Sequence, residues 1–325
     1  MAYTSMERYF PPGSAEIGRR KLIIGSAAGL AGIVIANYVP HIPQAHAQEP
    51  QLSHMQHVQN MEGKTNEDRG LYVINALKSM GYDPKIEKYS SFLTKGFNII
   101  FETGKGRQVI VFTSHYDAVP GSPGANDNAS SVAVSINAYQ ELAKQNLSNV
   151  KVRFIVFGDE EKHLVGSNQH VKSKDNLGGV IGVYSTELVG IGDTLIAWDV
   201  ISNKLLKSPI MEVLDRVVKG QGVTFYQKSD RTRLPNARGD QYSDHVPFEE
   251  KGIDAFGLTI GSSAYIKIPP GSTVFTSADV TGKSERGTRY HTPNDTSDSL
   301  NPESMQLMHK VIVGIAKEFD AKFKP

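Results

Sequence analysis

Short apolar segments alternate with segments of helical periodicity along most of this 325-residue chain. Residues 97–101, 108–113, 152–157, 180–184, 194–198 and 255–260 are rich in Val, Ile, Leu and Phe, and we expect them to be strands. The expected helices are 65–80, 130–144, 209–219 and 302–323. This alternation is typical of an α/β fold with three layers, in which helices cover both faces of a mixed, mostly parallel central sheet.

The composition rules out cysteine chemistry and gives no sign of a second domain. Because the chain has no cysteine, disulfides and thiolate ligands are ruled out, and any metal must be held by histidine and carboxylate groups. The balance of 35 basic and 34 acidic residues gives no electrostatic reason to expect nucleic acid as a partner. No composition break marks a second domain, so we expect one domain over residues 48–325, with surface loops at 226–242 and 269–287.

The first 47 residues have the features of an export signal. The pair Arg19-Arg20 precedes an apolar run at 22–36, which has the length of a signal-peptide core and is short for a membrane span. The sequence Ala45-His46-Ala47 offers a cleavage site, so the mature chain is expected to begin near Gln48. The paired arginines resemble a twin-arginine signal, which predicts export to the periplasm or the medium and no stable membrane association after cleavage. An uncleaved anchor helix is the alternative.

Five clusters of acidic residues and histidine lie along the chain. They are Ser114-His115-Tyr116-Asp117, Ala125-Asn126-Asp127-Asn128, Gly158-Asp159-Glu160-Glu161, Ser185-Thr186-Glu187 and Tyr290-His291-Thr292-Pro293-Asn294-Asp295. We expect them at the carboxyl ends of the strands, where open α/β sheets bind their ligands. Each cluster alone has a structural alternative, such as a helix N-cap, a solvated strand end or an exposed loop histidine.

The residue types in these clusters favour a metal-dependent hydrolase. His115 and Asp117 are two apart, so they face the same way on an extended chain, and a nearby carboxylate commonly holds the second nitrogen of a ligand histidine. Asp127 could bridge two cations through its two oxygens. Adjacent Glu160 and Glu161 after a wholly apolar strand could divide two tasks, one coordinating a metal and the other taking a proton from water.

Taken together, the clusters resemble those of the bacterial double-zinc aminopeptidases, which share a family with the transferrin-receptor-like zinc metallopeptidases. The matching stretches, in family order, are SHYDAVPGSPGANDNASSVA, FIVFGDEEKHLVGS, STELVG, SDHVPFEEKGIDAFGL and YHTPNDT. They run from residue 114 to 296 and so cover nearly all of the mature chain. The region from STELVG through the 209–219 helix is also similar to the alkaline phosphatase isozyme conversion aminopeptidases. The resemblance implies the zinc-dependent exopeptidase fold and peptide substrates with a free N-terminus.

The resemblance also implies two divalent metal ions, with Zn²⁺ the expected metal. One ion would be held by His115, Asp127 and Glu187. The other would be held by Asp127, Glu161 and His291, so that Asp127 bridges the pair. The two ions would lower the pKa of a shared water.

Three further roles follow from the same resemblance. Glu160 would be the general base that deprotonates the shared water. Asp117 would orient His115, and Tyr290 would help to stabilise the tetrahedral oxyanion. A cis peptide bond is expected between Asp127 and Asn128.

The main departure from the family pattern is Glu187. Most relatives carry aspartate there, in an Asn-x-Asp-Met sequence, whereas this chain reads Ser-Thr-Glu-Leu. The longer glutamate bears on the geometry of the first metal position and on the metal preferred. His245 is a rival ligand, although we expect it to be a pocket residue, and His163 and His170 are expected outside the site.

Other functions use the same residues. A glutaminyl cyclase of this fold would need one zinc and would retain Asp127, Glu161 and His291. The intact His115 favours the two-metal peptidase over the cyclase. A carboxypeptidase could clamp a substrate carboxylate with arginines between 231 and 238, although such loop arginines are commonly solvated. A binding module that kept only the fold is the non-enzymatic alternative.

Overall fold

The computed structural model of the protein describes residues 51–198, 207–227, 243–265 and 289–324. These residues all belong to one unit, Ala47–Pro325. The predicted export signal, the arginines between 231 and 238 and the predicted loop at 269–287 lie outside the described residues. None of the described helices is both long enough and apolar enough to cross a membrane.

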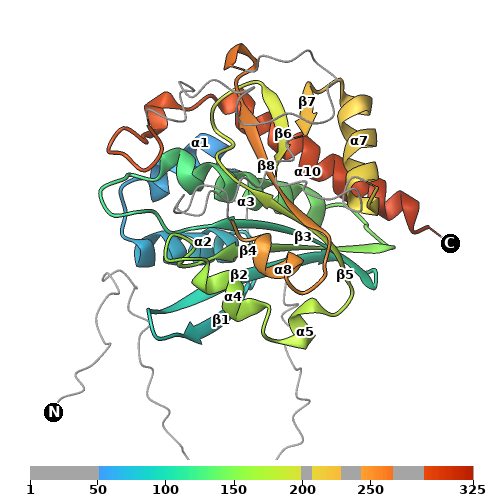
Figure 1. Ribbon diagram of the computed structural model, residues 1–325, viewed down its shortest axis with the longest axis horizontal. Helices are drawn as coiled ribbons and strands as arrows, with labels where there is room; N and C mark the ends of the chain where they lie inside the picture. The colour runs from blue at the N-terminus through green and yellow to red at the C-terminus, as the bar shows by residue number, and fades with distance from the viewer. Residues whose placement is uncertain (1–50, 199–206, 228–242, 266–288, 325) are drawn as a thin grey trace, which may run out of the picture. The chain divides into compact units, whose positions relative to one another are not determined.

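Eight strands within the described residues form one mixed sheet (Figure 1). The strands are β1 (Lys85–Ser90), β2 (Lys95–Gly104), β3 (Gln108–His115), β4 (Val150–Phe157), β5 (Val180–Thr186), β6 (Thr194–Trp198), β7 (Phe225–Gln227) and β8 (Ala255–Gly261). Their order across the sheet is β1-β2-β4-β3-β5-β8-β6-β7. The four central strands β4, β3, β5 and β8 run parallel, whereas β1–β2, β2–β4 and β8–β6 pair antiparallel. The predicted mixed sheet with a parallel centre is confirmed.

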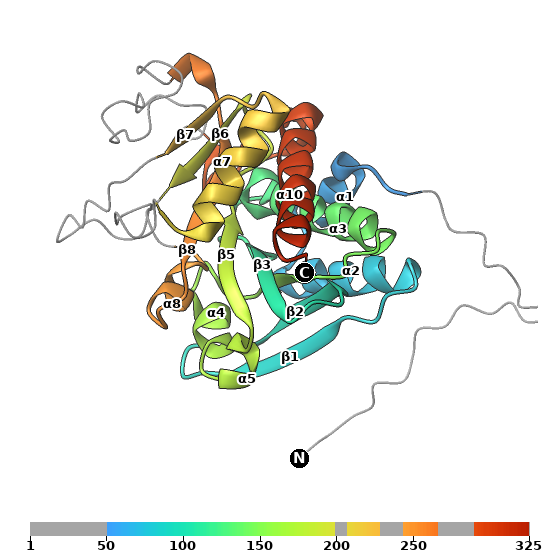
Figure 2. The ribbon, with the colours of Figure 1, turned by 90° about the vertical axis from the view of Figure 1, so that its right-hand side faces the viewer.

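Helices cover both faces of the sheet (Figure 2). The helices are α1 (His54–Met61), α2 (Asn66–Ser79), α3 (Ser130–Ala143), α4 (Val165–His170), α5 (Lys174–Leu177), α7 (Pro209–Gln221), α8 (Val246–Glu249) and α10 (Pro302–Lys322). Short helical turns occupy η1 (Ala125–Ala129), η2 (Ser263–Tyr265) and η4 (Ser297–Ser299). The helices α1, α2, α3, α7 and α10 lie on one side, and α4, α5 and α8 lie on the other. The three layers predicted from the sequence are therefore present.

The apolar runs of the central strands are explained by burial on both faces. In β3, Ile110 and Phe112 pack in the larger core with α3 and α10, while Val109 and Val111 pack in the smaller core with α8. Successive side chains of a strand point to opposite faces, so a strand covered on both sides needs apolar residues throughout. The core thus holds the strand ends rigidly from both sides.

Some elements differ from the sequence-based expectation. The edge strand β1 and the first helix α1 were not predicted, because both are short and rich in polar residues. The loop predicted at 226–242 is wrong at its beginning, since Tyr226 and Gln227 end β7 and are buried. The expected helix at 65–80 begins one residue later, because Thr65 is its N-cap and accepts a hydrogen bond from the backbone N–H of Asp68.

Candidate metal centre

The carboxyl ends of three adjacent parallel strands bring the acidic and histidine clusters together. His115 is the last residue of β3 and pairs in register with Phe157, the last residue of β4. Glu160 and Glu161 follow in the loop after β4, and Glu187 directly follows β5. Parallel neighbours end at the same edge of a sheet, which is why residues distant in sequence meet there.

Asp127 enters this edge from η1, the turn that precedes α3. The peptide bond between Asp127 and Asn128 is cis, as the resemblance implied. The buried carboxylate of Asp295 fixes the turn, because it accepts hydrogen bonds from the backbone N–H groups of Asn126 at 2.8 Å and Asp127 at 3.1 Å. Asp295 stands shortly after His291, so the same contacts hold the His291 segment against η1.

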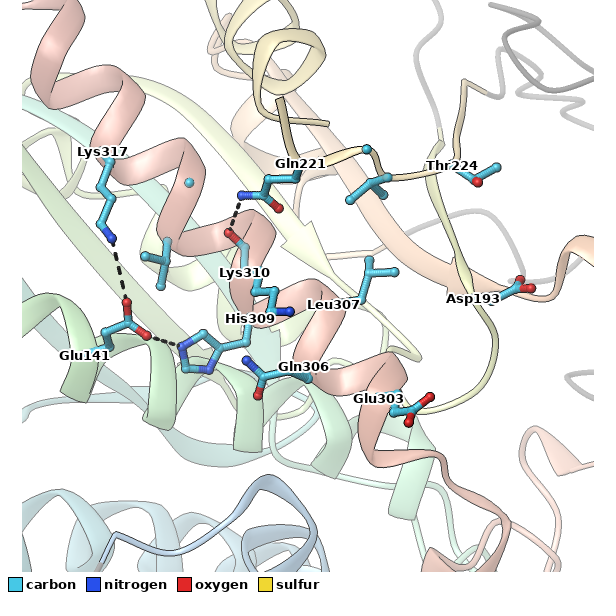
Figure 3. A pocket seen from close by; sticks show the side chains of 14 residues that line it. Glu141, Asp193, Gln221, Thr224, Glu303, Gln306, Leu307, His309, Lys310 and Lys317 are labelled. Carbon is cyan, nitrogen blue, oxygen red and sulfur yellow. Dashed lines mark hydrogen bonds and ion pairs between the residues drawn. The ribbon is translucent and has the colours of Figure 1, made fainter. Parts of the chain in front are cut away.

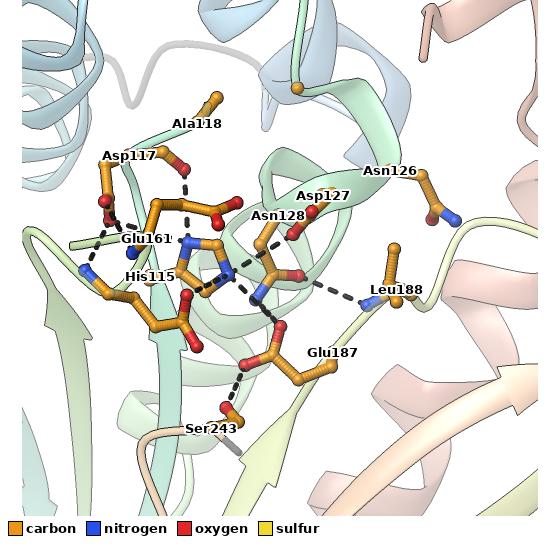
Figure 4. A network of polar contacts seen from close by, with 12 residues as sticks. His115, Asp117, Ala118, Asn126, Asp127, Asn128, Glu161, Glu187, Leu188 and Ser243 are labelled. Atoms are coloured by element: carbon orange, nitrogen blue, oxygen red, sulfur yellow. Dashed lines mark hydrogen bonds and ion pairs between the residues drawn. The ribbon is translucent and has the colours of Figure 1, made fainter. Parts of the chain in front are cut away.

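The two carboxylate oxygens of Asp127 face different histidines, His115 and His291, and Figure 4 shows the first of these contacts. Its Oδ1 lies 3.3 Å from Nε2 of His115, which in turn lies 3.3 Å from Oε2 of Glu187. Its Oδ2 lies 3.1 Å from Nε2 of His291, which lies 3.2 Å from Oε1 of Glu161. The structure therefore brings together all five residues that the sequence proposed as ligands.

These separations fit coordination of divalent metal ions. Two ligands of one tetrahedral zinc ion lie about 3.3 Å apart, because each stands about 2.0–2.1 Å from the metal. One ligand atom each from His115, Asp127 and Glu161 also lie within 4.8 Å of one another. Oδ2 of Asp127 is buried and contacts His291 without a hydrogen bond of good geometry, which leaves this oxygen able to bind a cation.

The carboxylate of Asp117 ties the loop after β4 to the end of β3. It accepts hydrogen bonds from the backbone N–H groups of Glu160 at 3.1 Å and Glu161 at 3.0 Å. The Nδ1 atom of His115 lies 3.1 Å from the backbone carbonyl oxygen of Asp117 and 3.5 Å from its carboxylate. Asp117 thus orients His115 chiefly through its backbone, while its side chain positions both glutamates.

The ionisable groups at this edge are strongly perturbed. Burial, aided by the negative charges of Asp244 and Glu187, raises the pKa of Glu160 well above its usual range, although His115 opposes this. Burial lowers the pKa of His291, but Asp127 and Glu161 outweigh it and raise that pKa to about 10. Such crowding of like charges in a buried site is relieved by a cation.

Glu187 is accommodated by partners that reach its longer side chain. Its Oε2 accepts a hydrogen bond from Nδ2 of Asn128 at 2.6 Å, and its Oε1 accepts one from Oγ of Ser243 at 2.6 Å. Oγ of Ser185 lies 3.5 Å from the same Oε1. These contacts fix both carboxylate oxygens and hold one of them toward His115.

The backbone is strained at three points of the site. Asp159, Leu188 and His291 have φ angles of 55°, 55° and 57°. The left-handed region costs a residue other than glycine about 1 kcal/mol or more. Each of these residues is a proposed site residue or directly adjoins one, and strain of this kind persists where the surrounding structure holds a functional geometry.

The remaining sequence-proposed residues occupy the following places. Tyr290 stacks on His291, with 3.7 Å between the ring centroids. The rival ligand His245 is fully buried and packs edge-on against Trp198. His163 is exposed, and His170 is buried at the end of α4, where its Nδ1 contacts Glu87 at 2.8 Å; the two histidines were expected outside the site.

Sequence reasoning missed Asp244. This aspartate is fully buried, and burial raises its pKa well above the usual range, with Glu187 and Asp117 adding to the effect and His115 opposing it. It stands between Ser243, which binds Glu187, and His245. The available signal was the sequence Ser243-Asp244-His245, in which an acid adjoins the rival ligand.

A groove beside α10 is distinct from this cluster (Figure 3). Glu141, His309 and Lys317 line it, and the carboxylate of Glu141 contacts both of the others, at 2.9 Å from His309 and 3.8 Å from Lys317. None of its lining residues belongs to the histidine and carboxylate cluster. The strand ends therefore remain the candidate site.

A buried set of histidines and carboxylates at the carboxyl edge of an α/β sheet defines a metal-dependent hydrolase as the class of protein. Comparison with known families agrees. The sequence model of the family described as Peptidase family M28 matches residues 98–316, and the chain belongs to this family.

Individual relatives have low sequence identity to this chain. Aminopeptidase YwaD of Bacillus subtilis is 28% identical over 229 residues, which are 68% of this chain and 43% of that protein. This chain thus spans less than half the length of that curated relative. The structure of BSAP, a zinc aminopeptidase from Bacillus subtilis, matches with a TM-score of 0.52 and 25% identity, covering 69% of this chain and 50% of the other. Porphyromonas gingivalis glutaminyl cyclase shares the fold, with a TM-score of 0.61 and 17% identity over 82% of this chain and 97% of its own.

Proposed function

We propose that the protein is an aminopeptidase that uses two zinc ions to hydrolyse N-terminal residues from peptides. The observation that carries this proposal is the bridging position of Asp127, whose two oxygens face His115 at 3.3 Å and His291 at 3.1 Å. Membership of Peptidase family M28 and similarity to a zinc aminopeptidase support it. A single-metal site would need no carboxylate shared between two histidines.

The residues divide into two ligand sets. His115, Asp127 and Glu187 would hold one ion, and Asp127, Glu161 and His291 would hold the other. When bound, the ions supply Lewis acidity, which acidifies a water molecule and polarises a carbonyl group.

Glu160 is proposed as the general base. Burial and nearby carboxylates raise the pKa of Glu160, and bound cations would keep it ionised, so its carboxylate would be a stronger base toward the attacking water. A carbon–oxygen bond to the first peptide carbonyl then forms, the carbon–nitrogen bond breaks, and Glu160 passes the proton to the leaving amine. Tyr290, beside His291, would stabilise the negative charge on the carbonyl oxygen.

Preference for a chain end follows from the charge of the site. The free α-amine of a peptide would be protonated and would lie near the carboxylates of Glu160 and Glu187. A protonated amine is stabilised beside buried carboxylates. An internal peptide bond carries no such charge.

The fold match to a glutaminyl cyclase makes that activity the second candidate. A cyclase would bind one zinc ion and close an N-terminal glutamine without attack by water. The pair of contacts from His115 to Asp127 and Glu187 favours the peptidase, because they complete a second ligand set.

Metal content of the purified protein, combined with hydrolysis of aminoacyl-anilides before and after chelation, tests the proposal. Two metals per chain and chelator-sensitive release from free N-termini would support it. One metal with cyclisation of glutaminyl peptides and no hydrolysis would establish the cyclase, and absence of any bound metal would establish a binding module.

Replacing Glu160 with glutamine separates proton transfer from metal binding. We expect turnover to fall by about 10²–10⁴-fold, because general base catalysis is lost while the ligands remain. Metal content should equal that of the wild type. The matched control is Asp159→Asn in the same loop, which removes a carboxylate that bonds to Tyr89 and Lys162. Full activity of Glu160→Gln would exclude Glu160 as the base.

We also propose that residues 1–47 direct export of the catalytic domain 48–325 and are then removed. The support is the twin-arginine pattern followed by an apolar run and an Ala-x-Ala site. Mass spectrometry of the exported protein checks this, and a product that retains Met1 would contradict cleavage.

A further inference from the structure

Arg69 of α2 is a buried cation that belongs to neither proposed ligand set and has no part in the proposed reaction. Among the described residues it is the only lysine or arginine that is fully buried. A buried charge is costly unless its hydrogen-bonding groups are satisfied. Its retention in the interior therefore calls for a specific role.

The guanidinium group of Arg69 donates four hydrogen bonds to backbone carbonyl oxygens. Nε donates to Tyr116, Nη1 donates to Pro123 at 3.0 Å and Met61 at 3.3 Å, and Nη2 donates to Gly124 at 3.0 Å. All four described acceptors are thus main-chain atoms, which fix the course of the backbone rather than the position of a side chain.

Three of these carbonyls belong to the two segments that carry proposed metal ligands. Tyr116 lies between His115 and Asp117. Pro123 and Gly124 directly precede η1, which carries Asp127. One rigid planar group therefore spans the end of β3 and the turn that delivers the bridging aspartate.

The contact between Arg69 and the η1 turn is close. Gly124 has a φ of +69°, and a Cβ atom there would lie 2.8 Å from Nη1 of Arg69 and 2.9 Å from the carbonyl oxygen of Asp127. A glycine is needed where a backbone in the left-handed region passes directly against another group. The backbone at the start of the turn is consequently packed against both the guanidinium of Arg69 and the side chain of Ala118.

We propose that Arg69 is a positioning residue that sets the distance between His115 and Asp127, and thereby the affinity of the site for metal. The inference rests on the proposed two-metal function. Five N–H donors in one plane can hold several carbonyl oxygens at once, which the single ammonium group of lysine cannot do with the same geometry. The shape of the guanidinium, rather than its charge alone, carries this role.

The test compares Arg69→Lys and Arg69→Met with the wild type and with Arg153→Met, all as full-length chains. Arg153 is a matched control, because it lies in the middle of β4, is largely buried and donates to Glu102 and to the carbonyl oxygen of Asn176. The probes are Zn²⁺ titrated calorimetrically into chelator-treated protein, and the visible absorption spectrum of the Co²⁺-loaded protein. Thermal unfolding of the metal-free proteins measures the purely structural cost of each substitution.

We expect both Arg69 variants to bind Zn²⁺ about tenfold or more weakly and to alter the Co²⁺ spectrum. Arg153→Met should lose stability yet keep wild-type affinity and spectrum. Wild-type affinity and spectrum in Arg69→Lys would overturn the inference, because charge alone would then suffice. Failure of both Arg69 variants to fold while Arg153→Met folds would also overturn it, since Arg69 would then be required for folding. A wild type that binds one ion or none would instead refute the two-metal function itself.

Discussion

Replacing Asp117 with asparagine should weaken both the fold and the reaction through one pair of hydrogen bonds. The carboxylate accepts the backbone N–H groups of Glu160 at 3.1 Å and Glu161 at 3.0 Å. Hydrogen bonds to a charged group contribute about 1.5–3 kcal/mol each, and neutral ones about 1 kcal/mol. Asparagine keeps one acceptor oxygen and turns its NH₂ group toward the second backbone N–H, so one bond weakens and the other is lost. The free energy of unfolding should therefore fall by about 3 kcal/mol.

The same change should slow catalysis more than it destabilises the protein. Without its anchor the loop after β4 can shift, and a displacement of about 1 Å at a reacting group can cost about 10²-fold in rate. Urea unfolding of the chelator-treated protein measures stability, and aminoacyl-anilide hydrolysis at saturating Zn²⁺ measures rate. The control is Asp159→Asn, because this neighbouring acid accepts its hydrogen bond from the Tyr89 hydroxyl and not from the glutamate backbone. If Asp117→Asn matched Asp159→Asn in both assays, the reasoning would be refuted.

Two further changes test the site and the fold. Glu187→Asp shortens a carboxylate that is held by Asn128 and Ser243 at 2.6 Å each, so it should lower metal affinity by about 10–100-fold, and unchanged metal content at limiting Zn²⁺ would contradict this. Burial lowers the pKa of His57 to about 4 from 6.5, so its contribution to stability is present above pH 6.5 and is lost as the pH falls toward 4. Relative to His57→Gln, the wild type should lose about 2 kcal/mol of unfolding free energy between about pH 6.5 and 5 in urea titrations, and parallel pH profiles would refute the argument.

The buried strands could be predicted because burial on two faces leaves a continuous apolar pattern. Residues 152–157 fall inside β4 for this reason. The edge strand β1 pairs with β2 alone, so its sequence KIEKYS needs no such pattern and was missed. A local signal for α1 did exist, since Ser53 and Gln56 form a capping box, but the helix is only eight residues long.

The proposed ligands could be found because each stands in a short cluster of chemically unusual residues. The residues that position these ligands do not stand in such clusters. Arg69 reaches the site through backbone carbonyls of Tyr116 and Gly124, and any sequence can supply a carbonyl. Asp244 lies in a segment far along the chain, and only the sheet topology brings it near Glu187. Sequence therefore indicates the chemistry, while the geometry that supports it depends on contacts between distant segments.

Several locally unfavourable features share the carboxyl edge of the sheet. Buried carboxylates whose pKa values are raised, left-handed backbone at Asp159, Leu188 and His291, and the buried guanidinium of Arg69 all lie there. The strands beneath them are packed by apolar side chains on both faces. This packing keeps the strained and charged edge in its folded geometry. Divalent cations at the Asp127 position would convert repulsion among the acids into attraction. Coupling between metal occupancy and stability should accordingly be concentrated in the loops after β3, β4 and β5, with the sheet itself nearly unaffected.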